Sequence, residues 1–268
     1  MEKDNIFKLN DVCYDYIGKD RALNNINMTI ERGECVSVLG ANGSGKSTLL
    51  KLLDGLYFCS KGELFGFNEK IDESIMADKQ TARAFHKKVG FVFQDPDVQL
   101  FLPTVWDEVA FAPLQMGLPR RDVAEIASDA LDQLGLFGLK DRAPYHLSEG
   151  EKKKVSIASV LTLDPDVWLM DEPTASLDPR SQGWVIDFIL ELGQRKKTAV
   201  IATHDLEIPY VATKDCYVLG QDHGVLAHGP SSEILENDEI LLSANLIHRH
   251  RHIHRGAAHS HPHKHWHS

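Results

Sequence analysis

Short apolar runs separated by amphipathic stretches set the pattern of this chain. The runs are Cys35–Leu39, Val89–Phe93, Asp166–Met170 and Thr198–Thr203, and their length and apolar character are typical of buried strands. Between the last two runs, Ser181–Leu192 has a helical pattern. Strands that alternate with helices predict a mostly parallel sheet that is covered on both faces.

Further regions predict helices outside that sheet. In Asp122–Leu134 the apolar residues recur at helical spacing and form one stripe. This stretch belongs to a longer region, about residues 95–161, that is rich in helical pattern and lacks β-branched runs, so we expect an inserted helical subdomain there. We also expect a short C-terminal helical segment over residues 231–247.

The composition bounds the class of protein. The chain has 268 residues, 43% of them hydrophobic and 25% charged, which suits one large domain or a core with a subdomain. Four scattered cysteines without a CxxC pair indicate reduced thiols of a cytosolic protein. The chain opens on a polar stretch rather than a signal peptide, and no apolar run approaches the roughly 18 residues of a membrane span. We therefore expect any role at a membrane to be that of a peripheral subunit.

Charge is distributed unevenly along the chain. The net charge is −10, but residues 248–268 carry four basic residues and no acid, so residues 1–247 carry −14. An acidic body of this kind argues against a surface that binds nucleic acid.

The stretch GANGSGKST, residues 40–48, lies between a predicted strand and a predicted helix. It fits the phosphate-loop pattern GxxxxGK[ST], in which glycines let backbone N–H groups curl around phosphate oxygens. The positive end of the helix dipole adds to this attraction. We predict that Lys46 reaches the β- and γ-phosphates of a nucleotide and that Ser47 ligates Mg²⁺. A glycine-rich turn before a core helix is the alternative.

The stretch VWLMDEP, residues 167–173, is an apolar strand that ends in two adjacent acids. A strand that ends at the nucleotide places Asp171 near Mg²⁺, directly or through water. Glu172 then polarises an attacking water, as a general base or as a water-orienting residue. A pair of acids that caps the following turn is the alternative.

Five separated motifs together resemble the nucleotide-binding subunits of ABC transporters over residues 5–245. They are GANGSGKST (40–48), VFQDP with Gln94, LSEGE (147–151), LMDEPTASLD (169–178) and THD with His204. The resemblance implies an α/β fold of the P-loop NTPase class, an ABC ATPase with a RecA-like parallel-sheet core, a small N-terminal antiparallel β subdomain and an inserted helical subdomain. It also implies a nucleotide-binding domain over residues 1–230, with ATP and Mg²⁺ as its cofactors.

The functional residues of the family carry over motif by motif. The resemblance makes Gln94 the residue that senses Mg²⁺ and touches the membrane partner, Asp178 the D-loop aspartate and His204 the switch histidine on the γ-phosphate. Tyr16, or Tyr14 as the alternative, matches the aromatic residue that stacks on adenine. The implied catalytic residues are Lys46, Gln94, Glu172 and His204. The implied nucleotide-binding residues are Tyr16, Asn42, Gly43, Ser44, Gly45, Lys46, Ser47, Thr48, Ser148, Gly150 and Asp178. The implied Mg²⁺ ligands are Ser47, Gln94 and Asp171.

The signature sequence has a physical logic and one departure from the family. Ser148 begins a predicted helix, where an N-cap hydroxyl and free N–H groups favour an anion. In the family that anion is the γ-phosphate held by the opposite subunit, so the resemblance implies a head-to-tail dimer, with a homodimer and a heterodimer both open. The usual LSGGQ reads LSEGE here, with Ser148 and Gly150 retained. Glu149 and Glu151 add negative charge near a triphosphate, so we expect slower hydrolysis unless Lys152–Lys154 pair with them.

The stretch from Val89 to Pro119 resembles one branch in particular, the energy-coupling-factor ATPases and the related cobalt and nickel importers. It runs through QDPDVQLF into TVWDEVAF, with Glu108 where the branch usually has Asp and Gln115 where it often has Asn. The resemblance implies a groove that docks integral membrane subunits, a coupling subunit and a substrate-binding subunit, at the cytoplasmic face of the membrane. An ordinary helical subdomain is the alternative.

Nine of the fourteen histidines lie in residues 248–268, where they alternate with other residues. Alternate side chains of an extended chain lie on one face, and imidazole suits nickel, cobalt, zinc and copper. The tail is almost free of apolar residues, so we expect it to be disordered without metal. A purification tag or a passive solubilising tail is the alternative. The predicted nickel or cobalt ligands are His248, His250, His252, His254, His259, His261, His263, His265 and His267.

Together these features predict an ATPase that energises import of nickel or cobalt, with a dimer that closes on two Mg·ATP and a water positioned by Glu172 and His204. Vitamin uptake by the same ATPase gives no reason for the histidines. A metal store or chaperone with a regulatory ATP site does not need the hydrolytic residues. A soluble ABC protein of DNA repair or translation would need long insertions or two cassettes. An exporter role stays open.

Overall fold

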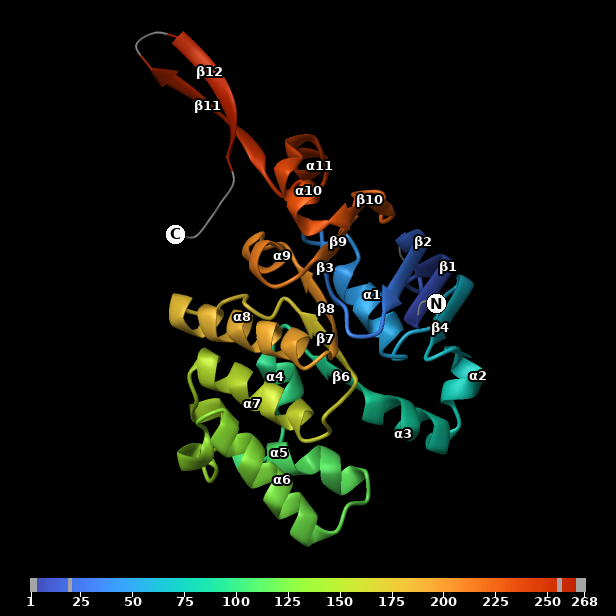
Figure 1. The fold of residues 1–268 in the computed structure, drawn as a ribbon, viewed down its shortest axis with the longest axis vertical. Coiled ribbons are helices and arrows are strands. Elements are labelled where there is room, and N and C mark those ends of the chain that lie inside the picture. Colours follow the sequence, from blue (N-terminus) through green and yellow to red (C-terminus); the bar gives the residue numbers. More distant parts are fainter. Residues whose placement is uncertain (1–3, 19–20, 255–256, 264–268) are drawn as a thin grey trace. The chain divides into compact units, whose positions relative to one another are not determined.

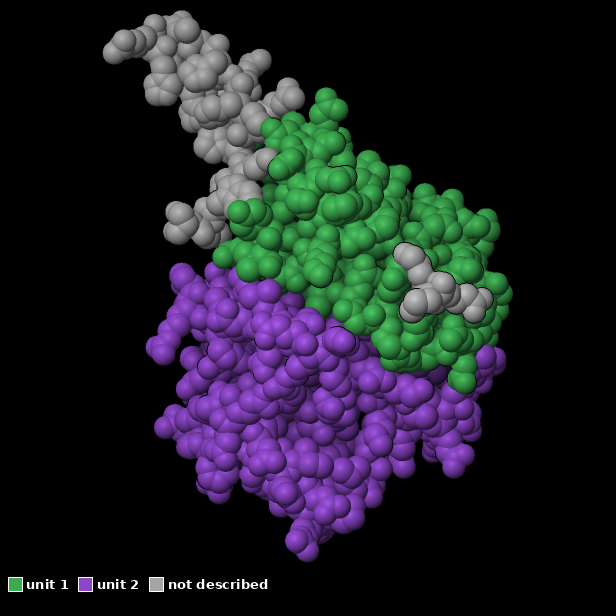
Figure 2. All heavy atoms as spheres, viewed as in Figure 1, with its two compact units in different colours: residues 1–72, 200–268 green, residues 73–199 purple. Residues whose placement is uncertain are grey.

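The computed structural model describes residues 4–18, 21–254 and 257–263, with side chains described as far as His248. The chain divides into two compact units, one of residues 1–72 and 200–268 and the other of residues 73–199 (Figure 2). The second unit is therefore one continuous segment inserted into the first.

The first unit opens with an antiparallel sheet in the order β2-β1-β4-β5 (Figure 1). β1 (Asn5–Asp15) pairs with both β2 (Arg21–Glu31) and β4 (Lys61–Gly66), and β5 (Glu69–Lys70) adds the edge. Over much of β2 the buried and exposed residues alternate, which is the pattern of a sheet with one covered face. This sheet is the predicted N-terminal antiparallel subdomain.

The strand before the phosphate loop pairs with a strand from near the end of the chain. β3 (Cys35–Leu39) pairs in parallel with β9 (Asp215–Leu219), and β9 pairs antiparallel with β10 (Val225–Pro230). β3 and β9 are buried along nearly their whole length, as their apolar runs require, whereas β10 alternates. α1 (Lys46–Leu53) begins at the end of the phosphate loop.

Short helices and a hairpin complete the first unit. α9 (Glu207–Val211) follows the THD motif, and α10 (Ser231–Glu236) and α11 (Asp238–Ser243) lie where the sequence predicts a C-terminal helical segment. α10 and α11 share a hydrophobic core with β3 and β9. β11 (His248–His254) and β12 (Ala257–His263) then pair antiparallel (Figure 1).

This hairpin differs from the disorder that we expect for residues 248–268. The alternation of histidine with other residues has a period of two, which is also the period of a strand. His265 and His267 lie outside the described residues, and so do the side chains of the other predicted tail ligands beyond His248.

The second unit is mostly helical. β6 (Val89–Val92) and β7 (Val167–Asp171) pair in parallel inside it. α5 (Val105–Gln115) packs against α6 (Arg120–Gln133) and α7 (Glu149–Leu161). The helices from α4 (Pro96–Gln99) to α7 correspond to the insertion predicted over about 95–161. The remaining elements of this unit are α2 (Glu73–Met76), α3 (Lys79–Lys88), the 3-10 turns η1 (Phe137–Leu139) and η2 (Pro144–His146), and α8 (Pro179–Gln194).

β8 (Thr198–Thr203) carries the chain from the second unit back into the first. Parallel pairs of buried strands, the separate antiparallel sheet and the helical insertion confirm the predicted α/β fold class. Within the described ranges, no helix has the length and apolar character needed to span a membrane.

Candidate nucleotide site

The phosphate loop curls around its own lysine. Lys46 is buried, and its Nζ donates to the carbonyl oxygens of Gly40 at 2.7 Å and Ala41 at 3.3 Å. A turn closed by the Ser44 N–H and the Ala41 carbonyl, 3.1 Å apart, bends the loop back on itself. The ammonium group is therefore held at the loop, where it supplies the positive charge that a bound phosphate requires.

Gly45 is required by the path of the loop into α1. Its φ is 107°, and a Cβ at this position would overlap the carbonyl oxygen of Ala22 in β2. α1 begins at the next residue, and no side chain caps its first N–H groups. Ser44 Oγ is buried and has no hydrogen-bond partner among the described residues. A buried unpartnered hydroxyl beside an uncapped helix start and a lysine fits a bound polyphosphate.

Three tyrosines form an aromatic cluster beside the loop. The rings of Tyr14 and Tyr57 are stacked with centroids 5.1 Å apart, and Tyr16 meets both of them edge-on. The hydroxyl of Tyr16 lies 2.9 Å from Thr48 Oγ1, at the start of α1. Tyr16 is thus tied to the phosphate loop directly, whereas Tyr14, the alternative aromatic residue, is packed against Tyr57.

Two buried acids end the strand β7. Asp171 is its last residue, and Glu172 follows with 4% exposure and a φ of 42°. A positive φ in a residue with a bulky side chain is strained, and such strain concentrates where a functional side chain must be aimed. The side chain of Glu172 is therefore fixed by its surroundings rather than free in solvent.

Ser148 caps the signature helix α7, as the sequence predicts. Its Oγ accepts from the Glu151 N–H at 3.4 Å, while Glu151 Oε2 accepts from both the Ser148 N–H and the Ser148 hydroxyl at 2.8 Å. These two bonds lower the pKa of Glu151, which therefore stays ionised at neutral pH. Glu149 is held differently, since its carboxylate pairs with Lys152 at 3.2 Å. Lys152 also pairs with Asp97 at 2.8 Å.

Asp178, the predicted D-loop aspartate, lies next to the predicted signature sequence. Asp178 caps α8 and accepts from the hydroxyl of Ser181 at 2.7 Å, and these bonds lower the pKa of its carboxyl group. A Cβ at Gly150 would overlap the hydroxyl of Ser181. The start of α7 and the start of α8 are thus in contact, and a side chain at position 150 would require Ser181 to move.

Lys153 anchors the segment that contains Gln94. Its side chain is 1% exposed, and its Nζ donates to the carbonyl oxygens of Phe93 at 2.9 Å and Gln94 at 2.8 Å. Gln99 adds a second link, because its Oε1 accepts from the Phe93 N–H at 3.1 Å and its Nε2 donates to the Ser156 carbonyl at 3.0 Å. The backbone at Gln94 is therefore fixed to α7.

The predicted residues fall in both units. The first unit holds Tyr16, the loop residues Asn42–Thr48 and His204, which is exposed just after β8. The second unit holds the others, namely Gln94, Ser148, Gly150, Asp171, Glu172 and Asp178. Within each unit, the structure joins Tyr16 to the phosphate loop and Gly150 to the Asp178 turn.

Sequence reasoning missed Lys153 and Gln99. One signal for Lys153 was present, because it recurs with Ile157 and Val160 at helical spacing, so a lysine lies within an apolar stripe. A lysine in such a stripe requires an acceptor in the core. The identity of that acceptor is a tertiary property that the pattern does not contain.

Exposed apolar side chains gather on the segment that the sequence assigns to docking. Val98 and Phe101 are each 67% exposed, and Phe101 meets Phe111 edge-on with centroids 5.5 Å apart. Leu114, also exposed, lies on the same helix as Phe111. The carboxylate of Glu108 is buried beneath this segment and accepts from the Leu102 N–H. Exposed aromatic and aliphatic side chains on an ordered segment are typical of a protein contact.

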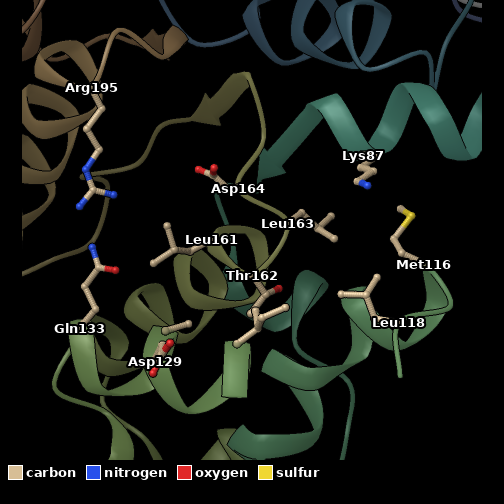
Figure 3. Close-up of a pocket in the computed structure, with 12 residues that line it drawn as sticks. Lys87, Met116, Leu118, Asp129, Gln133, Leu161, Thr162, Leu163, Asp164 and Arg195 are labelled. Atoms are coloured by element: carbon tan, nitrogen blue, oxygen red, sulfur yellow. The ribbon is translucent and has the colours of Figure 1, made fainter. Parts of the chain in front are cut away.

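A pocket of about 580 Å³ lies elsewhere in the second unit (Figure 3). Its lining includes the cations Lys87 and Arg195, the acids Asp129 and Asp164, and several apolar side chains. The described lining includes none of the predicted site residues. Within the described side chains there is also no group of three or more histidines, cysteines or acids that could hold a metal ion.

The parallel strands, the loop before α1 and the two acids at the end of β7 define a P-loop nucleotide-binding protein. A family model described as ABC transporter matches residues 23–175, more than half of the chain. The chain belongs to the ABC transporter family, and within it to the ATP-binding, ATP-hydrolysing subunits.

Individual relatives refine this placement. An ABC transporter ATP-binding protein of Methanosarcina acetivorans, named without a substrate, is 47% identical over 91% of this chain and 89% of its own length. The nickel import ATP-binding protein NikO of Rhodobacter capsulatus is 43% identical over 90% and 95%. The solved structure of cbiO1 from Clostridium perfringens, part of the ABC transporter complex cbiONQ, is 35% identical, with a TM-score of 0.76 and coverage of 91% and 96%.

Proposed function

We propose that this chain is the ATPase subunit that energises uptake of nickel or cobalt through a membrane transporter complex. The observation that carries the choice of cargo is the tail, which places nine histidines in residues 248–268. Imidazole is a ligand of choice for these late first-row metals. The similarity to a nickel import protein supports the same choice independently of the tail. In this proposal the histidines, from His248 to His267, bind nickel or cobalt.

In this proposal each predicted residue has its own role in binding the nucleotide. In the first unit, the loop N–H groups and Lys46 hold the β- and γ-phosphates, and Tyr16 stacks on adenine. Ser47, Gln94 and Asp171 supply the oxygen donors that suit Mg²⁺. Mg²⁺, when bound, neutralises charge that develops on the phosphates.

Hydrolysis itself requires an oriented water. In this proposal the carboxylate of Glu172 orients the attacking water and favours loss of its proton. His204 contacts the γ-phosphate from the first unit. Glu172 acts on the water and does not hold the nucleotide, so the loss of Glu172 should stop turnover without preventing ATP from binding.

In this proposal the chain has two kinds of partner, a second copy of itself and integral membrane subunits. A second copy of the chain completes the site head-to-tail, with the start of its α7 at the γ-phosphate and Asp178 close by. The apolar segment at Val98, Phe101 and Phe111 docks the integral membrane subunits, a coupling subunit and a substrate-binding subunit. The chain then acts as a peripheral subunit at the cytoplasmic face of the membrane.

The first test is the Glu172→Gln variant. The purified variant should bind ATP as the parent does, measured by titration calorimetry, and should hydrolyse it at least 100-fold more slowly, as expected when a water-activating residue is lost (about 10²–10⁴-fold). Hydrolysis close to the parent rate would remove Glu172 from the mechanism.

The cargo is tested by elemental analysis of source cells that lack the gene or carry Glu172→Gln. Nickel or cobalt alone should fall in both strains. Unchanged levels of both metals would refute the cargo and favour vitamin uptake. As a control on the tail, purified protein without residues 248–268 should retain ATP hydrolysis and lose Ni²⁺ binding.

A further inference from the structure

In the signature sequence of this chain, the carboxylate of Glu151 bonds to the serine that is proposed to meet a phosphate. Both donors of Ser148, its N–H and its hydroxyl, bond to the same carboxylate oxygen of Glu151, each at 2.8 Å. The Glu151 N–H in turn bonds to Ser148 Oγ at 3.4 Å, so four polar groups at the start of α7 are engaged with one another. The carboxylate oxygen thus lies where an oxygen of a bound phosphate would accept from the same donors.

The neighbouring acid provides an internal comparison. Glu149 precedes Glu151 by two residues, carries the same charge and is exposed, but its carboxylate bonds to Lys152 at 3.2 Å. The structure gives Glu149 no hydrogen bond with Ser148. The two acids of the signature therefore carry the same charge but have different partners, and Glu151 is the one that contacts the serine.

We propose that Glu151 is a positioning residue that occupies the donors of Ser148, so that the γ-phosphate carried by a second copy must displace a carboxylate before the dimer closes. This inference rests on the proposed function, in which Ser148 meets that phosphate. It concerns the ATP concentration at which closure occurs, not the chemistry of hydrolysis. Closure becomes an exchange of one anion for another at the start of α7.

The size of the effect follows from the charge of the acceptor. Hydrogen bonds to an ionised carboxylate contribute about twice as much as bonds to a neutral amide oxygen. Gln at position 151 preserves the capping-box geometry, since Glu and Gln both serve there, but it offers only a neutral acceptor. Breaking the contact should therefore become roughly fivefold easier in Glu151→Gln.

The experiment compares the parent with Glu151→Gln and Glu149→Gln, two variants with the same change in charge. The first readout is the dependence of the hydrolysis rate on ATP concentration. The second is ATP-driven dimerisation followed by analytical ultracentrifugation, with Glu172→Gln added to each protein so that bound ATP persists. Thermal melts verify that α7 remains folded.

We expect Glu151→Gln to lower the KM for ATP, and the ATP concentration for half-dimerisation, by roughly fivefold with little change in kcat. Glu149→Gln should shift both by less than about twofold, because the carboxylate of Glu149 is exposed and paired with Lys152 rather than with Ser148. If both variants shift the KM and the half-dimerisation concentration equally, net charge explains the effect, and the contact between Glu151 and Ser148 has no role of its own. If the parent hydrolyses ATP and dimerises but Glu151→Gln changes neither the KM nor the half-dimerisation concentration, this inference is wrong and the proposed function stands. Absence of ATP-driven dimerisation in every protein would overturn the proposed dimer and this inference with it.

Discussion

The buried ammonium group of Lys153 should give the protein a distinctive pH dependence of stability. Burial lowers the pKa of Lys153 from its ordinary value of 10.5 to about 8, although negative charge on Asp171, Asp95 and Glu149 acts in the opposite direction. Lys153→Met removes the titrating group and keeps an unbranched side chain that fills the same space. The comparison of the two proteins therefore isolates one buried charge.

The sign of the effect follows from proton binding. In the unfolded chain the amine keeps its proton up to about pH 10.5, but in the folded protein only up to about pH 8. Between these values the unfolded state binds more protons, so the free energy of unfolding of the parent rises with pH. The gap between the two pKa values corresponds to roughly 3 kcal/mol, of which roughly 2.5 kcal/mol appears between pH 7 and pH 10.

The assay is denaturant unfolding of both proteins at pH 7, 8, 9 and 10. Other groups titrate in both proteins and cancel in the difference, provided that they do not couple to Lys153. The difference, parent minus variant, should change in favour of the parent by roughly 2.5 kcal/mol over this range. A difference that stays constant within about 0.5 kcal/mol would refute the buried charge, because a lysine in water titrates alike in both states.

Two further substitutions test the phosphate loop. Gly45→Ala should abolish ATP binding measured by calorimetry, because its Cβ would overlap the carbonyl oxygen of Ala22 at a φ that alanine disfavours; parent-like affinity would show that the loop tolerates another path. Tyr16→Phe should cost about 1 kcal/mol of stability through the lost bond to Thr48 and leave ATP affinity nearly unchanged, whereas Tyr16→Ala should also weaken ATP binding by about tenfold or more. Equal ATP affinities in these two variants would remove the ring of Tyr16 from the adenine site.

The strands and helix starts of this protein could be predicted well, because the sequence patterns that produce them span only a few residues. The run at Cys35–Leu39 is a strand with the same bounds in the structure, and the strand at Thr198–Thr203 is as well. Ser148 was recognisable as an N-cap, since a serine before a helical pattern has few other functions. Periodicity and capping act over a few residues, so they are visible in the sequence itself.

The side-chain partners could not be predicted in the same way. The sequence offered Lys152–Lys154 as partners for both signature acids, and the structure pairs Lys152 with Glu149 but gives Glu151 to Ser148. Lys154 lies over the ring of Trp184, 4.7 Å from its centroid, and its charge helps to lower the pKa of Glu151. Which of several nearby charges a carboxylate meets depends on helix direction and neighbouring elements. These are properties of the folded chain.

The pairing of β3 with β9 sets a delay during synthesis on the ribosome. Val36 is opposite Asp215, so about 180 residues must be made after Val36 before this pairing can form. At about 5–20 residues per second, the strand before the phosphate loop waits roughly 10–35 s, and the continuous unit of residues 73–199 emerges complete in the meantime. An unpaired apolar strand is prone to aggregation during such an interval. Substitutions in β9, which carries none of the predicted site residues, should therefore reduce the yield of folded protein before they affect its catalysis.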